Sequence, residues 1–143
     1  MNNKKIKEQA EVLYRKVDSF IISCIDKDGY PMTKAVVPGK HRESLKELYF
    51  ATNTSSNFAK AIVKNNKASV YFYRKKLFVW KGCYLKGKME IVDDIKIKKQ
   101  YWSEKFKEAY QEKSFTDPDF CVLKFVPNSG RFYANYTIHD FEI

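Results

Sequence analysis

One stretch, YFATNTSSNF (residues 49–58), leads from a strand pattern directly into a helix start. Aromatic residues favour a strand, whereas Ser, Thr and Asn favour turns and helix N-caps. Phe58, Ala59, Ile62 and Val63 then recur at helical spacing. The first N–H groups of a helix lack partners within the helix, and the helix dipole adds positive potential there. The stretch therefore predicts a strand, a turn and a helix, with a turn that is suited to an anion.

The hydroxyl groups of this turn have two interpretations. In the first, Ser55 or Ser56 only caps the helix, as serine commonly does. In the second, the hydroxyls of Thr52, Ser55 and Ser56 join the free N–H groups to hold a phosphate. The turn alone does not decide between a cap and a phosphate cradle.

Outward from this stretch, short apolar segments alternate with turn residues. Asp-Gly at 28–29 is a hairpin signal, because glycine supplies a positive φ. The predicted helices span 4–17, 58–65 and 94–106, and a turn is predicted at Arg74-Lys75-Lys76. The predicted strands span 19–25, 32–37, 47–52, 68–73, 77–92 (bent at Gly82 and Gly87), 120–126 and 131–136.

The order of these segments predicts a mostly β fold with flanking helices (α+β). Most strands follow one another through short turns, which indicates an antiparallel sheet of six or seven strands. Closure into a barrel would protect the sheet edges. The 143 residues contain no repeat and no linker, so we expect a single domain over 1–143.

Composition narrows the class of protein. The net charge is +10, but most lysines are scattered singly, which favours a plain basic surface over an anion-binding one. Cys24, Cys83 and Cys121 form no CxxC pair and lie among apolar residues, which indicates reduced, packed thiols. The first residues are polar and no apolar run reaches membrane-spanning length. We therefore expect a cytoplasmic protein with no membrane partner.

No catalytic side chain can be singled out from the sequence. The two histidines, His41 and His139, have no nucleophile at a known spacing, and no metal-ligand spacing occurs, so no metal site is predicted. Neither a Walker loop nor GxGxxG is present. Any redox or group-transfer chemistry would therefore depend on a cofactor.

Five segments together resemble the pyridoxamine 5′-phosphate oxidase-like flavin-binding split barrels, in particular the short general stress protein branch. They are DGYPMTKAVV (28–37), the turn at 52–58, KNNKASV (64–70), LKGKMEIVDD (85–94) and DPD (117–119) with the strand that follows. The resemblance covers the chain from Val12 to its end. It implies a six- or seven-stranded split barrel that forms a homodimer, with FMN in the groove between the subunits.

The resemblance also implies a set of cofactor-binding residues. Lys34 stands where the family places a basic residue for the FMN phosphate, and the backbone of Ala35, Val36 and Val37 would face the flavin ring. Thr52 and Ser56 match the phosphate hydroxyls, in the turn that also contains Ser55. Lys81 and Gly82 match a strand that borders the ring.

Two positions depart from the family pattern. Asn57 and Phe58 stand where the family usually has basic residues. Lys60 cannot replace them, because two residues along a helix turn by about 200° around its axis. The phosphate would lose one or two charge-assisted hydrogen bonds unless another lysine, such as Lys40, supplies the charge.

From these features we expect an FMN-dependent oxidoreductase that acts on an unidentified small-molecule substrate or electron donor. The alternative is a stress protein that binds a flavin, a deazaflavin or haem on the same fold without turnover. A further alternative is a nucleic-acid-binding module that uses the +10 charge. No nucleic-acid motif is present, so nucleic acid is not an expected partner. The vitamin reaction is not inherited with the fold.

Overall fold

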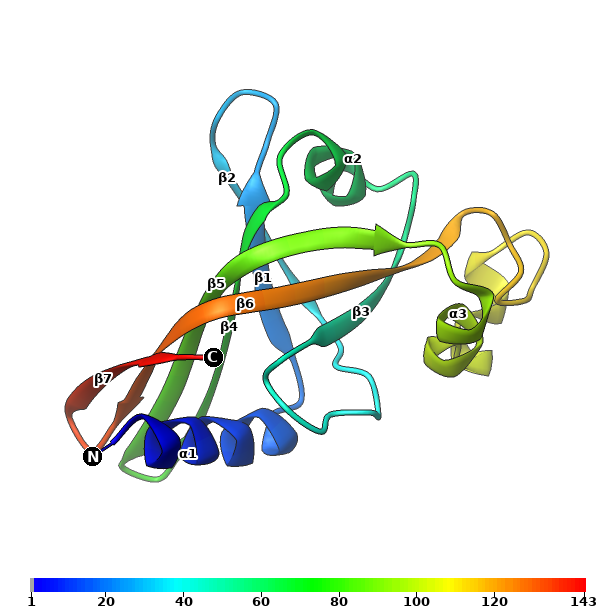
Figure 1. The fold of residues 1–143 in the computed structure, drawn as a ribbon. Coiled ribbons are helices and arrows are strands. Elements are labelled where there is room, and N and C mark those ends of the chain that lie inside the picture. Colours follow the sequence, from blue (N-terminus) through cyan, green and yellow to red (C-terminus); the bar gives the residue numbers. More distant parts are fainter. Residues whose placement is uncertain (1) are drawn as a thin grey trace.

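The computed structural model describes residues 2–143, in which one sheet is flanked by short helices (Figure 1). In chain order the elements are α1 (Asn3–Lys16), β1 (Phe20–Ile25), β2 (Pro31–Val36), β3 (Leu48–Asn53), α2 (Asn57–Lys64), β4 (Lys67–Lys76), β5 (Val79–Val92), α3 (Ile95–Tyr101), the 3-10 helix η1 (Glu104–Ala109), β6 (Phe120–Ala134) and β7 (Thr137–Glu142). Side chains of Asn2, Ser56 and Asp94 cap α1, α2 and α3 by accepting hydrogen bonds from their first turns.

The sheet has seven antiparallel strands in the order β2-β1-β4-β5-β6-β3, and β7 pairs with the second half of β6. This confirms the predicted antiparallel, α+β split-barrel fold. The expected closure is wrong, because the edge strands β2 and β3 do not pair with each other. In Figure 1 the long strands β5 and β6 cross the molecule from α1 to α3. We call the gap between β2 and β3 the seam.

Strand β6 is longer than predicted and replaces two expected strands. Residues 127–130 are Pro-Asn-Ser-Gly, which is a typical turn sequence, yet β6 continues through them. A register shift between Lys86 and Gly87 of β5 accommodates the extra residue, since Lys86 pairs with Ser129 and Gly87 with Pro127. The bulge also explains how a proline without an N–H is tolerated within the sheet. The last strand, β7, was not predicted.

Two other boundaries differ from the prediction. Arg74-Lys75-Lys76 belongs to β4, and the turn consists of Leu77 and Phe78. The helix that Asp94 starts ends at Tyr101 instead of continuing to Phe106, because Trp102 leaves the helical conformation. The Trp102 ring packs edge-on against Phe120, 5.0 Å between centroids, so contacts with β6 replace the last turns of the helix.

Aromatic side chains form the core between the sheet and α1. Phe20, Phe50, Phe72, Phe125 and Phe132 are all fully buried. Strand alternation supplies most of them, and Tyr14 of α1 stacks on the ring of Phe20 at 5.4 Å. The three cysteines are buried and unpaired, which confirms the predicted thiols.

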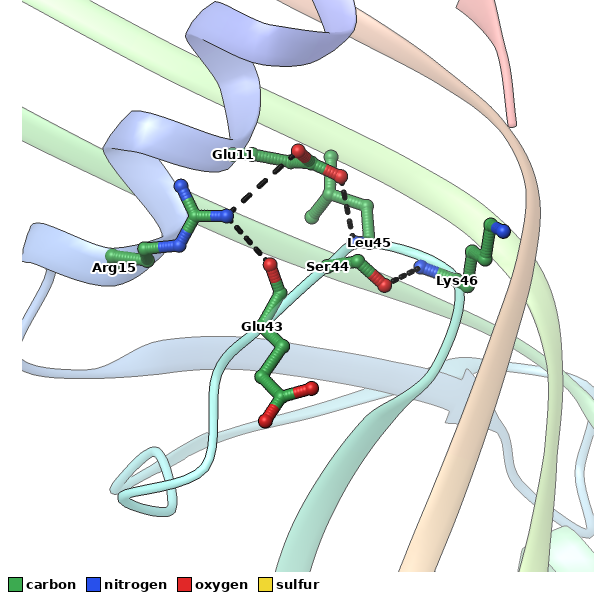
Figure 2. Close-up of polar contacts among 6 residues, drawn as sticks. All are labelled: Glu11, Arg15, Glu43, Ser44, Leu45 and Lys46. Atoms are coloured by element: carbon green, nitrogen blue, oxygen red, sulfur yellow. Dashed lines mark hydrogen bonds and ion pairs between the residues drawn. The ribbon is translucent and has the colours of Figure 1, made fainter.

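The loop over 37–47 carries the chain from one edge strand to the other and is tied to α1 (Figure 2). The Arg15 guanidinium donates to the Glu43 carbonyl and pairs with Glu11, whose carboxylate accepts from the Leu45 N–H. Arg42 donates to the carbonyls of Tyr14 and Val17. These contacts satisfy carbonyls at the C-terminal end of α1 and fix the course of the loop.

The two ends of the chain also lie together. The side chain of Asn3 donates to the Glu142 carbonyl and accepts from the Glu142 N–H. Among the described helices, none has the length and apolar character needed to cross a membrane.

Candidate functional site

Lys34 bridges the seam between the edge strands. Alternation along β2 turns its side chain to the inner side of the sheet, and its Nζ lies 3.1 Å from Thr52 Oγ1 on β3. The ammonium also lies over the ring of Phe58, 5.2 Å from the centroid. The structure therefore brings together three of the predicted site residues, Lys34, Thr52 and Phe58.

Among residues 2–143, the Lys34 ammonium has no counter-ion. Its neighbours are a hydroxyl and an aromatic ring, and no ion pair among residues 2–143 involves it. Partial burial lowers the pKa of Lys34, while the nearby Cys121 and Cys24 oppose this shift. A half-buried cation without a counter-ion favours the binding of an external anion.

The hydroxyl turn before α2 holds an anion that belongs to the chain itself. Asp119 Oδ1 accepts from the Ser55 N–H at 2.9 Å and from the Thr54 hydroxyl at 2.8 Å, and its Oδ2 accepts from the Ser55 hydroxyl at 3.0 Å. The hydrogen bonds from Ser55 and Thr54 hold the pKa of Asp119 below its usual value. Ser55 therefore faces Asp119, where a phosphate would be repelled.

Ser56 acts as the helix cap, as the first interpretation of the turn predicted. Its hydroxyl oxygen accepts from the Ala59 N–H at 3.1 Å. The Ser56 hydroxyl proton is not used in that bond and can still be donated to an anion. Asn57, the next residue, is exposed at the first position of α2.

We expect Asp119→Asn to lower stability at neutral pH and to matter less as the solution becomes acidic. Because the folded-state pKa is depressed, the contribution is complete above the unfolded pKa of about 3.9 and disappears as the pH falls through the folded value. Thermal melts of both proteins between pH 7 and pH 3 should therefore converge at the acidic end. The exposed Asp93→Asn variant is the charge-matched control, and a Tm difference that stays constant with pH would contradict the role of the carboxylate.

Phe58 and Lys60 lie on different sides of α2, as the helical geometry predicted. Phe58 is 2% exposed and belongs to the core. Lys60 is exposed and lines a groove of about 580 Å³ between α2 and the β1–β2 turn, together with Asn57 and Lys64. Lys60 therefore does not stand in for the missing basic residue at position 58.

The remaining predicted residues do not contact the Lys34 ammonium through any hydrogen bond or cation–π contact among residues 2–143. Ala35 is exposed on the outer side of β2 and Val36 turns inward, whereas Val37 is exposed just after the strand ends. Gly82 is buried on β5, where an added Cβ would lie 2.7 Å from the Tyr71 hydroxyl. Lys81 is exposed and lines a groove beside α1. One chain does not gather the complete set around Lys34.

Sequence reasoning missed a group of aromatic residues on the outer side of the sheet. Tyr73 and Trp80 stack nearly parallel, with centroids 5.1 Å apart, and Tyr71 stacks on Tyr73 at 5.8 Å. Tyr84 pairs with Tyr71 in the register and is also exposed. We call Tyr71, Tyr73, Trp80 and Tyr84 the outer aromatic face. The alternation Val-Tyr-Phe-Tyr at 70–73, with Val70 and Phe72 buried, is the signal that places two of them outside.

Neither histidine contributes to the seam. His41 packs edge-on against Tyr101, with centroids 5.9 Å apart, and His139 lies on β7 opposite Phe132. Within residues 2–143 there is no group of three His, Cys, Asp or Glu side chains placed to hold a metal ion.

Comparisons with known proteins relate this fold to one family. The model of the family described as "Pyridoxamine 5'-phosphate oxidase like" matches residues 22–139. A solved structure from Clostridium acetobutylicum, of a protein related to general stress protein 26 of Bacillus subtilis (pyridoxinephosphate oxidase family), is 29% identical, with a TM-score of 0.80 over 100% of this chain and 97% of that one. General stress protein 26 from Bacillus anthracis is 18% identical, with a TM-score of 0.77 over 96% and 98% of the two chains.

A haem-binding protein from Mycobacterium smegmatis also has this fold. It is 11% identical, with a TM-score of 0.75 over 96% of this chain and 57% of that one. No curated protein matches the sequence. The family match over residues 22–139 and the shared split-barrel fold show that the chain belongs to the pyridoxamine 5′-phosphate oxidase-like family.

Proposed function

We propose that this protein binds FMN and acts in the cytoplasm as a flavin-dependent oxidoreductase, in the form of a homodimer. The observation that carries the proposal is the Lys34 ammonium, which has no counter-ion and meets the Thr52 hydroxyl at the seam. A phosphate group would supply the missing negative charge. Family membership makes FMN the first phosphate-bearing ligand to test.

The residues at and next to the seam offer a small set of hydrogen-bond donors for a phosphate. Because Lys34 donates to Thr52 Oγ1, the Thr52 hydroxyl proton is free to be donated to a phosphate oxygen. The Ser56 hydroxyl proton is free for the same reason, since its oxygen caps α2. Ser55 has no such role in this arrangement, because Asp119 holds it. Lys34, Thr52 and Ser56 would thus hold the phosphate, with one cation among them.

The flavin ring would lie over the outer side of β2, along the backbone of Ala35–Val37. Gly82 lies three strands away in the sheet order, so one subunit supplies only part of the wall. A second copy would bring its outer aromatic face, which lies over Gly82, to the outer side of the first copy's β2. Bound flavin would supply the redox chemistry, and the chain's residues would bind and orient it.

Light scattering should give a mass of about twice 16.9 kDa at micromolar concentration. The outer aromatic face leaves stacked rings exposed, and a dimer would bury them. A charge at one end of this stack, in Trp80→Glu, should shift the protein to monomer and reduce FMN binding together. A wild-type protein that is monomeric at high concentration would remove the proposed inter-subunit site.

Lys34→Ala should weaken FMN binding by about 1.5–3 kcal/mol, or roughly ten- to a hundredfold or slightly more, because it removes a charge-assisted contact with the phosphate. Riboflavin has no phosphate and should bind both proteins almost equally. Titration with the two ligands measures the difference, and Lys60→Ala, which changes an exposed lysine of the neighbouring groove, is the control. Equal losses for FMN and riboflavin would contradict the phosphate role of Lys34.

A second candidate is a binding protein on the same fold that carries a flavin or deazaflavin without turnover. The buried Phe58 favours it, because the phosphate site then has a single cation and suits a less charged group. Haem fits less well at the seam, where neither histidine is available as an axial ligand. An absorption spectrum and mass spectrometry of the released ligand identify the cofactor. Bleaching by a reduced nicotinamide would favour the enzyme.

A further inference from the structure

Two hairpin turns project from the same end of the sheet, beside the start of α1 (Figure 1). Leu77 and Phe78 form the turn between β4 and β5, and Asn135 and Tyr136 form the turn between β6 and β7. Phe78 is 94% exposed, Tyr136 88% and Leu77 83%. These three large side chains therefore contribute almost no buried surface to the fold of the chain.

The backbone conformation at these turns is energetically unfavourable for large side chains. Leu77 has φ 54° and Tyr136 has φ 62°, in the left-handed region that glycine and asparagine adopt readily. Bulky side chains are disfavoured there, and such positions cluster at functional sites. Large side chains that pack against nothing and occupy unfavourable backbone positions indicate a contact outside the subunit.

The surroundings of the β4–β5 turn are strongly basic. The sequence from residue 48 to residue 89 contains lysines and arginines but no Asp or Glu. A groove of about 340 Å³ lies between this hairpin and α1, and no acidic side chain is among its described lining residues. Its lining combines apolar and cationic side chains, namely Val12, Leu13, Leu77, Val79, Lys16, Arg74, Lys76 and Lys81, with Gln9.

We propose that this end of the protein docks on an anionic phospholipid surface. Leu77 and Phe78 would enter the boundary between headgroups and acyl chains, and Arg74 and Lys76, which line the groove beside α1, would contact lipid phosphates. A protruding apolar tip within a ring of cations combines the two forces that hold peripheral proteins on such membranes. Docking on a membrane surface needs no spanning segment, so it is compatible with the lack of a membrane-spanning helix among the described residues.

The shape and chemistry of the tip favour a membrane over other partners. Single-stranded nucleic acid is held by aromatic side chains on which bases stack, whereas Leu77 cannot stack and no aromatic side chain is among the described residues that line the basic groove. The dimer proposed above would use the outer aromatic face and would leave the tip free, so the choice of a membrane over a second copy rests on that proposal. Docking does not depend on bound FMN, so vesicle binding and FMN binding can be tested separately.

The test is co-sedimentation of the purified full-length protein with phosphatidylcholine vesicles that contain or lack about one third phosphatidylserine. We expect binding only to the vesicles with phosphatidylserine, and weaker binding at high salt. Combining Leu77→Gly with Phe78→Ser should weaken binding about tenfold or more, because the inserted apolar surface is lost. Glycine suits the positive φ at position 77, so the turn should remain folded, which a thermal melt checks.

Tyr30→Ser is the matched control, since Tyr30 is a 69% exposed aromatic residue beside the β1–β2 turn at the other end of the sheet. It should bind vesicles like the wild type, and all variants should keep their FMN affinity. Absence of binding to phosphatidylserine vesicles would overturn the proposal. So would conversion of the dimer to a monomer by the tip variant, which would assign the tip to a second copy. Salt-sensitive binding to oligonucleotides but not to vesicles would assign it to nucleic acid.

Discussion

Phe58→Lys should destabilise the protein by about 3–5 kcal/mol and should not tighten FMN, because it replaces a core ring with a buried, unpaired cation. Phe58 is 2% exposed, and its ring lies beneath the Lys34 ammonium, 5.2 Å from the centroid. The new ammonium would lie beside that of Lys34, and the loss of the Phe58 ring would remove the cation–π contact. For a domain of this size the loss corresponds to a fall in Tm of roughly 10–20 °C.

Thermal melts of the apo proteins, with FMN titrations at low and high salt, measure both expectations. Phe58→Leu is the control, because it keeps an apolar side chain at the position and should cost about 1–1.5 kcal/mol. The family pattern alone also allows the opposite result, in which a lysine at position 58 restores a phosphate contact. A Phe58→Lys protein that melts like the wild type and binds FMN about 1–2 kcal/mol more tightly would show that the start of α2 can open to a cation.

Gly87→Ala should cost about 2–4 kcal/mol, because the bulge between β5 and β6 has no room for a methyl group. A Cβ at Gly87 would lie 2.1 Å from the Val126 carbonyl oxygen and 2.6 Å from the Pro127 Cα. Both atoms belong to the backbone of β6, so they cannot move aside as a flexible side chain would. The two strands would have to separate where β6 contains its extra residue.

Chemical denaturation of Gly87→Ala beside Lys88→Ala checks this expectation. Lys88 is the next residue of β5 and is exposed, so its truncation should change the free energy of unfolding by less than about 0.5 kcal/mol. Equal midpoints for Gly87→Ala and the wild type would mean that the bulge relaxes easily and does not depend on glycine.

Local signals predicted most of the elements. The Asp-Gly turn at 28–29, the alternation along the strands and the caps at Ser56 and Asp94 all act over a few residues, and the structure has them where the sequence indicated. The continuation of β6 through Pro127 was not predictable in this way. The continuation depends on a bulge in β6 that faces Gly87 of β5, and the turn-like sequence of residues 127–130 does not indicate this bulge.

The site shows the same division between local and distant causes. Ser56 as a cap follows from its position before α2, but the partner of Ser55 is Asp119, 64 residues away in the chain. No pattern around residue 55 points to that carboxylate. The resemblance to the family, rather than the residues themselves, placed Lys34 and Thr52 at one site, and the structure brings them within hydrogen-bond distance.

The late position of β6 and β7 in the chain determines when the fold can be completed during synthesis on the ribosome. β3 pairs only with β6, and the core that Ile6 and Tyr14 of α1 enter also needs Phe141 of β7. The nascent chain therefore carries an unpaired edge strand and an unfinished core until β6 and β7 have been synthesised. Any chain that stops early, by truncation or by stalled translation, will expose this apolar surface to chaperones and proteases.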